Sequence, residues 1–121
     1  MRIRSKLWIE TADGEILLGG GLLKIFKLIE RHGSMSAAAK ELGMSYRALW
    51  GKVRTLEERL GVQLVERAAQ GARRRGAHLT EQGKQLVALF EQFETQIETH
   101  IENASSQFIE KLTHAGFRPN S

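Results

Sequence analysis

Residues 35–54, MSAAAKELGMSYRALWGKVR, contain two helical patterns that meet at a glycine. Ser36 can cap the first helix, with Ser34 as the alternative, because a serine hydroxyl accepts a free N–H of the opening turn. Gly43 follows at a position where a helix C-terminus favours a residue that tolerates positive φ, and Ser45 can cap the second helix. A helix, a tight turn and a second helix form the helix-turn-helix arrangement.

The apolar residues of this stretch recur on one side of each helix, as a helix-turn-helix requires. The expected core positions are Ala38, Ala39, Leu42, Met44, Leu49 and Val53. The opposite face can enter a DNA major groove if it is exposed, and it carries Tyr46, Arg47, Gly51 and Arg54. Trp50 lies about 100° round the helix from Leu49, so it can pack at the edge of the core or touch DNA. An ordinary αα-corner is the alternative to a DNA-binding motif.

Residues before this stretch predict a β-hairpin and a helix. In residues 4–18, two strand-like segments flank Asp13-Gly14, a dipeptide typical of hairpin turns whose central residues both need positive φ. We interpret Gly19–Gly21 as a flexible connector, because no phosphate-binding motif follows it. Residues 22–31, LLKIFKLIER, are then a helix whose wide apolar stripe packs on more than one neighbour.

Residues after this stretch predict a wing. The second helix continues to about residue 60, and Glu57–Arg59 is interpreted as a solvated face. Residues 62–67 and 78–79 form two short strands on either side of a loop, residues 68–77. Three adjacent arginines in this loop favour contact with phosphate or the minor groove, and a solvated loop is the alternative. They are Arg73, Arg74 and Arg75.

The C-terminal third predicts one long helix, capped by Thr80 and extending to about His114. Its apolar residues recur at steps of three or four, and such a seam would be exposed in a monomer. We therefore expect a homodimer with an interface formed by Phe90, Phe93, Ile97, Ile101 and Phe108. A domain of this size cannot cover such a helix, so its far end is expected to lie against another chain or a domain outside this sequence.

These elements predict a mainly α fold with small β-hairpins. Residues 1–80 would form an N-terminal hairpin and a winged helix-turn-helix, and residues 81–121 a long C-terminal dimerisation helix with a frayed tail. The chain has a net charge of +4. Residues 31–80 hold ten Lys or Arg and four Asp or Glu, whereas residues 81–121 hold three and six. The positive charge therefore accompanies the helix-turn-helix, which favours nucleic acid as its partner.

Composition excludes several classes of site. The chain of 121 residues has no cysteine, which rules out disulfides and thiolate metal sites. No apolar run approaches the ~20 residues of a membrane span, and the first ten residues lack the apolar core of a signal peptide. We therefore expect a cytoplasmic protein with no membrane partner. The four histidines have no metal-ligand spacing, and no catalytic motif is present, so we expect no metal, no cofactor and no enzymatic activity.

Residues 33–67 resemble the winged helix-turn-helix of LysR-type regulators, through the Ala-rich first helix, the Leu-Glu pair near the end of the second helix and the following strand. The closer resemblance is to the DNA-binding domain of the ModE family of molybdate-responsive regulators. It covers about residues 20–115, and Ser-Tyr-x-x-x-Trp is its most specific part. The residues that carry it are Gly43-Met44-Ser45-Tyr46 with Trp50, Val65-Glu66-Arg67, the Gly-rich stretch 71–76, Leu79-Thr80 and Gly83.

The resemblance implies a homodimer, joined through the N-terminal region and the long helix, with reading helices and wings set on successive major grooves of double-stranded DNA. ModE proteins of the full type carry C-terminal molybdate-binding domains, and this sequence ends where they would begin. Residues 81–121 offer no basic oxyanion pocket, so molybdate binding is not expected in this chain.

We predict a sequence-specific DNA-binding transcription regulator, with molybdenum-related genes as candidate targets. The alternative is a protein-interaction module that uses the long helix and has no DNA site. The predicted DNA-binding residues are Ser36, Ser45, Tyr46, Arg47, Trp50, Arg54, Arg73, Arg74 and Arg75.

Overall fold

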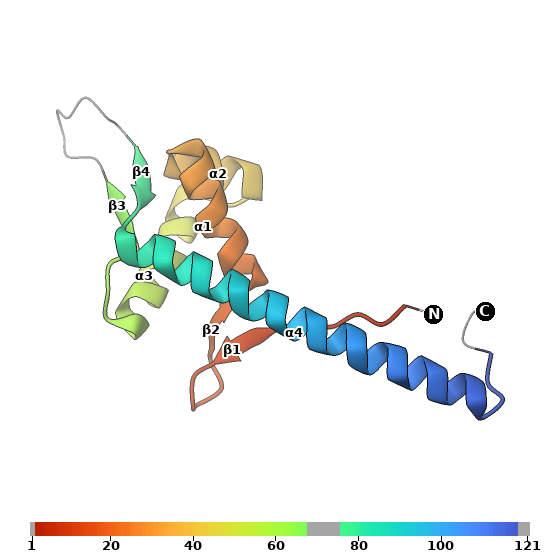
Figure 1. Cartoon of the computed structure of the whole chain (residues 1–121). Helices are drawn as coiled ribbons and strands as arrows, with labels where there is room; N and C mark the ends of the chain where they lie inside the picture. The colour runs from red at the N-terminus through yellow and green to blue at the C-terminus, as the bar shows by residue number, and fades with distance from the viewer. Residues whose placement is uncertain (1, 68–75, 119–121) are drawn as a thin grey trace. The chain divides into compact units, whose positions relative to one another are not determined.

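The computed structural model describes residues 2–67 and 76–118. They fall into two parts, residues 8–90 and residues 2–7 with 91–118. Figure 1 labels the elements in chain order as β1 (Trp8–Glu10), β2 (Ile16–Gly19), α1 (Gly20–His32), α2 (Met35–Leu42), α3 (Tyr46–Leu60), β3 (Val65–Arg67), β4 (Ala77–Leu79) and α4 (Glu81–His114). The strands form two antiparallel hairpins, β1 with β2 and β3 with β4. The predicted mainly helical fold with small hairpins is confirmed.

The N-terminal hairpin forms as predicted, but its turn is of another kind. Ile9 pairs with Leu18, and the register shifts by one residue between Ile9 and Glu10. Gly14 has a φ of 89°, whereas no described residue other than glycine has a positive φ. The turn therefore lacks the two positive-φ residues expected for Asp13-Gly14. Instead, the Thr11 hydroxyl donates a hydrogen bond to the Asp13 carboxylate, which lowers the pKa of that carboxyl.

The prediction of a flexible connector at Gly19–Gly21 is wrong. Gly19 is the last residue of β2, where it pairs with Trp8, and Gly20 and Gly21 open α1. The ladder with β1 holds Gly19 extended, so the chain passes from strand to helix without a loop. The helix ends at His32, one residue after the predicted range, where Gly33 adopts a left-handed φ of 63° and donates its N–H to the Ile29 carbonyl.

The helix-turn-helix is confirmed, with one correction to its caps. Ser34, not Ser36, caps α2, because its hydroxyl accepts the Ala37 N–H at 3.2 Å. Helix formation from Met35 buries that side chain to 3% exposure and leaves Ser36 on the exposed side of the first turn. Ser45 caps α3 as predicted, and its hydroxyl accepts the Ala48 N–H at 3.0 Å.

The core of residues 8–90 lies between α1, α2, α3, the first part of α4 and the two hairpins. Four of the six expected core positions of the helix-turn-helix are buried, namely Ala38, Ala39, Leu49 and Val53. Leu42 and Met44 are half-buried at its edge. The largest fully buried side chains elsewhere in the core are Phe26, Ile29, Leu56, Leu64 and Val65. Burying one face of α3 leaves its other face available.

The segment Glu57–Arg59 is exposed at Glu58 and Arg59, as the sequence predicted, but Glu57 is half-buried and two of the three side chains make tertiary contacts. The Glu57 carboxylate accepts backbone N–H groups ahead of and within β3. The Arg59 guanidinium donates to the Ile16 carbonyl at 2.9 Å and pairs with Glu15 on the N-terminal hairpin. Both side chains therefore tie the end of α3 to neighbouring elements, whereas Glu58 between them is exposed.

The long helix α4 has the bounds that the sequence predicts, and Thr80 caps it by accepting the Gly83 N–H at 3.0 Å. Phe90 is only 3% exposed, so its expected exposure along the apolar seam is wrong. Phe93 and Phe108 are 39% and 53% exposed, and Ile97 and Ile101 are half-buried. The exposed part of the seam therefore begins after Phe90.

The described residues contain neither a membrane-spanning helix nor a metal-binding cluster. Over residues 2–67 and 76–118, none of the helices has the length and apolar character needed to cross a membrane. Within the same ranges, no three His, Cys, Asp or Glu side chains gather as they would around a metal ion.

Candidate nucleic-acid interface

The exposed face of α3 holds most of the predicted reading residues. Arg47 and Arg54 are both exposed, and Tyr46 is 38% exposed. Because Arg47 and Arg54 are seven residues apart, they lie within about 20° of each other around the helix axis. The opposite face of α3 is buried, so this side of the helix presents two guanidinium groups to solvent.

Trp50 lies at the boundary between this face and the core. It is half-buried, and its indole Nε1 is buried with no hydrogen-bond partner in the part of the chain that the structure describes. Its ring meets the Tyr46 ring edge-on, with centroids 6.4 Å apart and an interplanar angle of 71°. Trp50 therefore lies at the edge of the core, and its contact with DNA stays a prediction.

Arg67 joins this cluster from the wing, and sequence reasoning missed it. Its guanidinium carbon lies 5.5 Å from the centroid of the Tyr46 ring and 5.1 Å from that of Trp50. The Arg54 guanidinium carbon lies 5.6 Å from the Trp50 centroid. A signal was available, because side chains two residues apart share one face of a strand. Val65 is buried beside α3, which puts Arg67 on the same side of β3.

The wing is fastened to the helices at both of its strands. Val65 pairs with Leu79 in the antiparallel register of β3 and β4. The Glu30 carboxylate on α1 accepts the Leu79 N–H at 3.2 Å, and the Ala77 N–H donates to the Gly33 carbonyl at 3.1 Å. These bonds hold β4 to α1, and the Glu57 carboxylate holds the start of β3 to α3. Its predicted phosphate contacts, Arg73, Arg74 and Arg75, lie outside the described residues.

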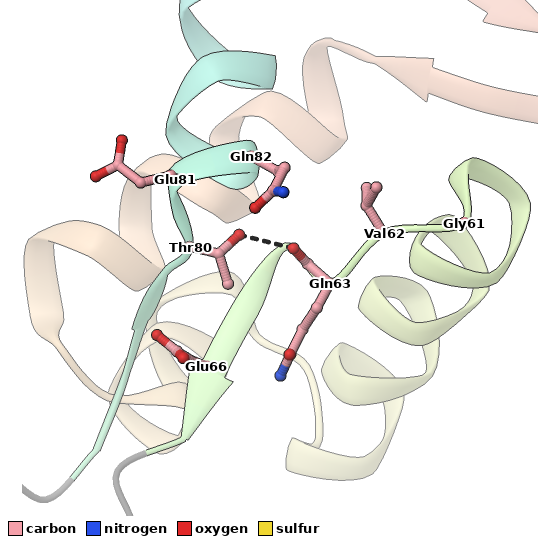
Figure 2. A pocket seen from close by; sticks show the side chains of 7 residues that line it. All are labelled: Gly61, Val62, Gln63, Glu66, Thr80, Glu81 and Gln82. Atoms are coloured by element: carbon pink, nitrogen blue, oxygen red, sulfur yellow. Dashed lines mark hydrogen bonds between the residues drawn. The ribbon is translucent and has the colours of Figure 1, made fainter.

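Figure 2 shows an open pocket near the wing, between the end of α3, the segment that leads to β3 and the start of α4. The Thr80 hydroxyl donates to the Gln63 carbonyl across it at 2.7 Å. Its lining residues are Gly61, Val62, Gln63, Glu66, Thr80, Glu81 and Gln82. Two of these are carboxylates and none is basic, so the lining does not match an oxyanion, which is bound by cationic donors.

The helix-turn-helix and wing match a known family. A family model described as bacterial regulatory helix-turn-helix protein, lysR family, matches residues 21–84. The chain is 31% identical over 109 residues to the molybdenum transport protein ModE of Azotobacter vinelandii, covering 90% of this chain and 40% of that protein. It is 38% identical over 73 residues to the molybdenum-pterin-binding protein MopA of Rhodobacter capsulatus, covering 60% and 28%. The chain therefore spans less than half of each relative's length.

A solved structure shows the same fold bound to DNA. The DNA-binding domain of CbnR, in the crystal structure of its complex with DNA, superposes with a TM-score of 0.57 at 27% identity. The match covers 74% of this chain and 98% of that one. One protein that shares this fold was therefore crystallised with DNA. The exposed face of α3 is basic, as a surface that binds DNA is expected to be.

Proposed function

This chain belongs to the lysR family of bacterial regulatory helix-turn-helix proteins, and we propose that it is a transcription regulator that reads the sequence of double-stranded DNA. The observation that carries the proposal is the exposed basic face of α3, with Arg47 and Arg54 on one side of a helix whose other side is core. Arginine is the residue that most often makes a bidentate contact to guanine in the major groove. A regulator acts on the chromosome, so we place it in the cytoplasm.

In this proposal α3 enters the major groove and Arg47, near its N-terminus, reads a base edge. The cap at Ser45 brings the positive end of the helix dipole near a phosphate. Ser36 is exposed in the first turn of α2, and its hydroxyl can donate a hydrogen bond to a phosphate of the DNA backbone. Arg73–Arg75 in the wing would bind phosphate groups or the minor groove, because side chains on a loop can follow the DNA backbone.

We propose a homodimer held by α4. The exposed apolar residues of its seam are Phe93 and Phe108, and Ile97 and Ile101 are half-buried between them. A stripe of this kind is rarely left open in a monomer. A two-fold dimer would also present two reading helices to half-sites about one helical turn, ~34 Å, apart.

The target genes are proposed from the relatives. Two of them are named for molybdenum transport and for binding of molybdenum-pterin, which supports a regulator of molybdenum-related genes. Molybdate itself is not proposed as a ligand of this chain. Residues 81–121 carry three Lys or Arg against six Asp or Glu, and the pocket of Figure 2 is lined by carboxylates without a cation.

Selection of bound fragments from the genomic DNA of the source bacterium, with and without molybdate, tests these proposals together. We expect one enriched motif with two related half-sites, near genes of molybdenum metabolism, and the same enrichment in both conditions. A single half-site would contradict the dimer, and enrichment that depends on molybdate would contradict the absence of a molybdate site. No enrichment of any fragment would overturn the proposed function.

A protein-interaction module is the second candidate, and the exposed side chains of α4 favour it. Leu89, Phe93 and Phe108 are 56%, 39% and 53% exposed, an apolar surface that a partner helix could cover. Binding of random duplex across a salt series separates the two functions. A DNA-binding regulator releases counterions and loses affinity steeply with salt, whereas an interaction module binds duplex weakly at every salt concentration.

A further inference from the structure

The side chains around Trp50 form one cluster of aromatic and cationic groups. Tyr46, Trp50 and Arg54 come from successive turns of α3, and Arg67 comes from β3. The guanidinium of Arg67 lies within cation–π distance of both rings, and that of Arg54 lies within the same range of Trp50. Such contacts form when a cation lies within about 6 Å of a ring centroid. The Trp50 indole therefore contacts the guanidinium groups of two arginines, one from α3 and one from β3.

These two arginines lack acidic partners in the part of the chain that the structure describes. Other charged side chains of α3 and β3 are engaged: Arg59 pairs with Glu15, and the Glu66 carboxylate lies 3.1 Å from the His78 ring nitrogen. No such pair forms to Arg54 or Arg67 among residues 2–67 and 76–118. Two exposed positive charges beside one ring repel each other, and an anion bound beside them would relieve the repulsion.

Trp50 is poorly placed to read a base. The indole N–H is the only hydrogen-bond donor of a tryptophan side chain, and in this chain that nitrogen is buried. The ring itself is contacted by Tyr46 at its edge and by two guanidinium groups. The part of Trp50 that could recognise a base edge is therefore turned into the protein.

We propose that Trp50 is a platform and not a base reader, and that Arg54 and Arg67, held on it, form a phosphate-binding site where α3 and the wing grip the DNA backbone together. This inference rests on the proposed function, since its ligand is the phosphodiester backbone of duplex DNA. It assigns Arg67 a role in binding, and it makes Trp50 a positioning residue that acts through the two arginines.

The test measures affinity for a selected site and for random duplex across a salt series. Replacing Arg54 and Arg67 together by Ala should lower the slope of log K against log salt by about 0.9 for each phosphate that the protein no longer neutralises. The preference for the selected site over random duplex should change little, because phosphate contacts carry no direct sequence information. Replacing Lys84 and Lys111 by Ala removes the same charge from α4 and should leave the slope nearly unchanged.

Substitutions of Trp50 are compared in two backgrounds. Trp50→Leu should lower the slope in the otherwise unchanged chain and have no further effect in the chain that already carries Arg54→Ala and Arg67→Ala. Trp50→Phe keeps a ring for the guanidinium groups and removes no hydrogen bond, because Nε1 has no described partner; it should retain most of the slope. If Trp50→Leu reduces the preference for the selected site in both backgrounds, Trp50 reads bases and the proposal is wrong.

A fluorescence measurement checks this cluster without DNA. The chain has two tryptophans, so Trp8→Phe leaves Trp50 as the only one. Arg67→Ala and Arg54→Ala should each shift the Trp50 emission, because a cation leaves the ring. Unchanged emission in both variants would contradict the contacts of the two guanidinium groups with the Trp50 ring. A wild-type chain that binds no duplex would instead refute the proposed function and leave this fluorescence result to stand separately.

Discussion

The carboxylate of Glu57 accepts the backbone N–H of Leu64 at 2.7 Å, so the helix α3 itself holds the residue that precedes the wing. The same oxygen accepts the Val65 N–H at 3.1 Å. Leu64 and Val65 are 1% and 2% exposed, so water does not readily replace these bonds. This carboxylate fixes the first strand of the wing to α3, the helix proposed to read DNA.

Glu57→Ala should therefore destabilise the fold. Leaving buried N–H groups without a partner costs about 1–3 kcal/mol, and we expect a loss of that size in the free energy of unfolding, measured by urea denaturation. Glu58→Ala is the matched control, because Glu58 is the exposed neighbour, and it should change stability by less than about 0.5 kcal/mol. Equal effects of the two substitutions would mean that the Glu57 bonds add nothing.

Replacement by Ala should destabilise the fold at Gly83 and stabilise it at Gly51. A Cβ on Gly83 would lie 2.3 Å from the Leu64 carbonyl oxygen, whereas nothing lies within 4 Å of one on Gly51. Gly83→Ala should cost about 1–3 kcal/mol through overpacking. Gly51→Ala, in an open helical position, should stabilise by about 0.5–1 kcal/mol. Thermal unfolding of both variants measures this, and a more stable Gly83→Ala variant would contradict the close approach of α4 to Leu64.

Arg47→Ala should weaken binding to the selected DNA site more than binding to random duplex. If Arg47 makes a bidentate contact to guanine, its removal costs roughly 1–3 kcal/mol on the specific site. Fluorescence anisotropy with both duplexes at one salt concentration measures the difference. Equal reductions in affinity for the two duplexes would show that Arg47 contacts phosphate and does not read a base.

Replacing Arg73, Arg74 and Arg75 by Ala should flatten the salt dependence of DNA binding. Removing one phosphate contact lowers the slope by about 0.9, and a dimer presents two wings. Affinity should fall for every duplex, while the preference for the selected site is largely kept. The measurement is a salt series with the triple variant, and Lys84→Ala with Lys111→Ala serves as the control for charge. An unchanged slope would mean that the wing loop is only solvated.

Ile97→Lys with Ile101→Lys should convert the proposed dimer to monomers and weaken DNA binding, because two charges would be buried at the seam of α4. Gln96→Lys with His100→Lys is the matched control, since it adds lysines at the same spacing on exposed positions of the same helix. Sedimentation velocity at micromolar concentration measures the assembly. A wild-type chain that sediments as a monomer would contradict the dimer.

Local sequence determined the helix-turn-helix, because its signals act within one or two turns. Ser45 caps α3 and the glycines at positions 33, 43 and 61 end α1, α2 and α3 with positive φ. The period of the apolar residues then decides which face of each helix is buried. For the same reason the sequence alone predicted that Arg47 and Arg54 share the exposed side of α3, as they do.

Tertiary structure decided the features that depend on residues far apart in the chain. Pairing with Trp8 draws Gly19 into β2, and the burial of Met35 selects Ser34 over Ser36 as the cap of α2. Glu57 and Arg67 look like surface residues in sequence, because the amides and rings that they contact lie on other elements. Only the folded chain brings β3 against α3, and that contact joins Arg67 to Trp50.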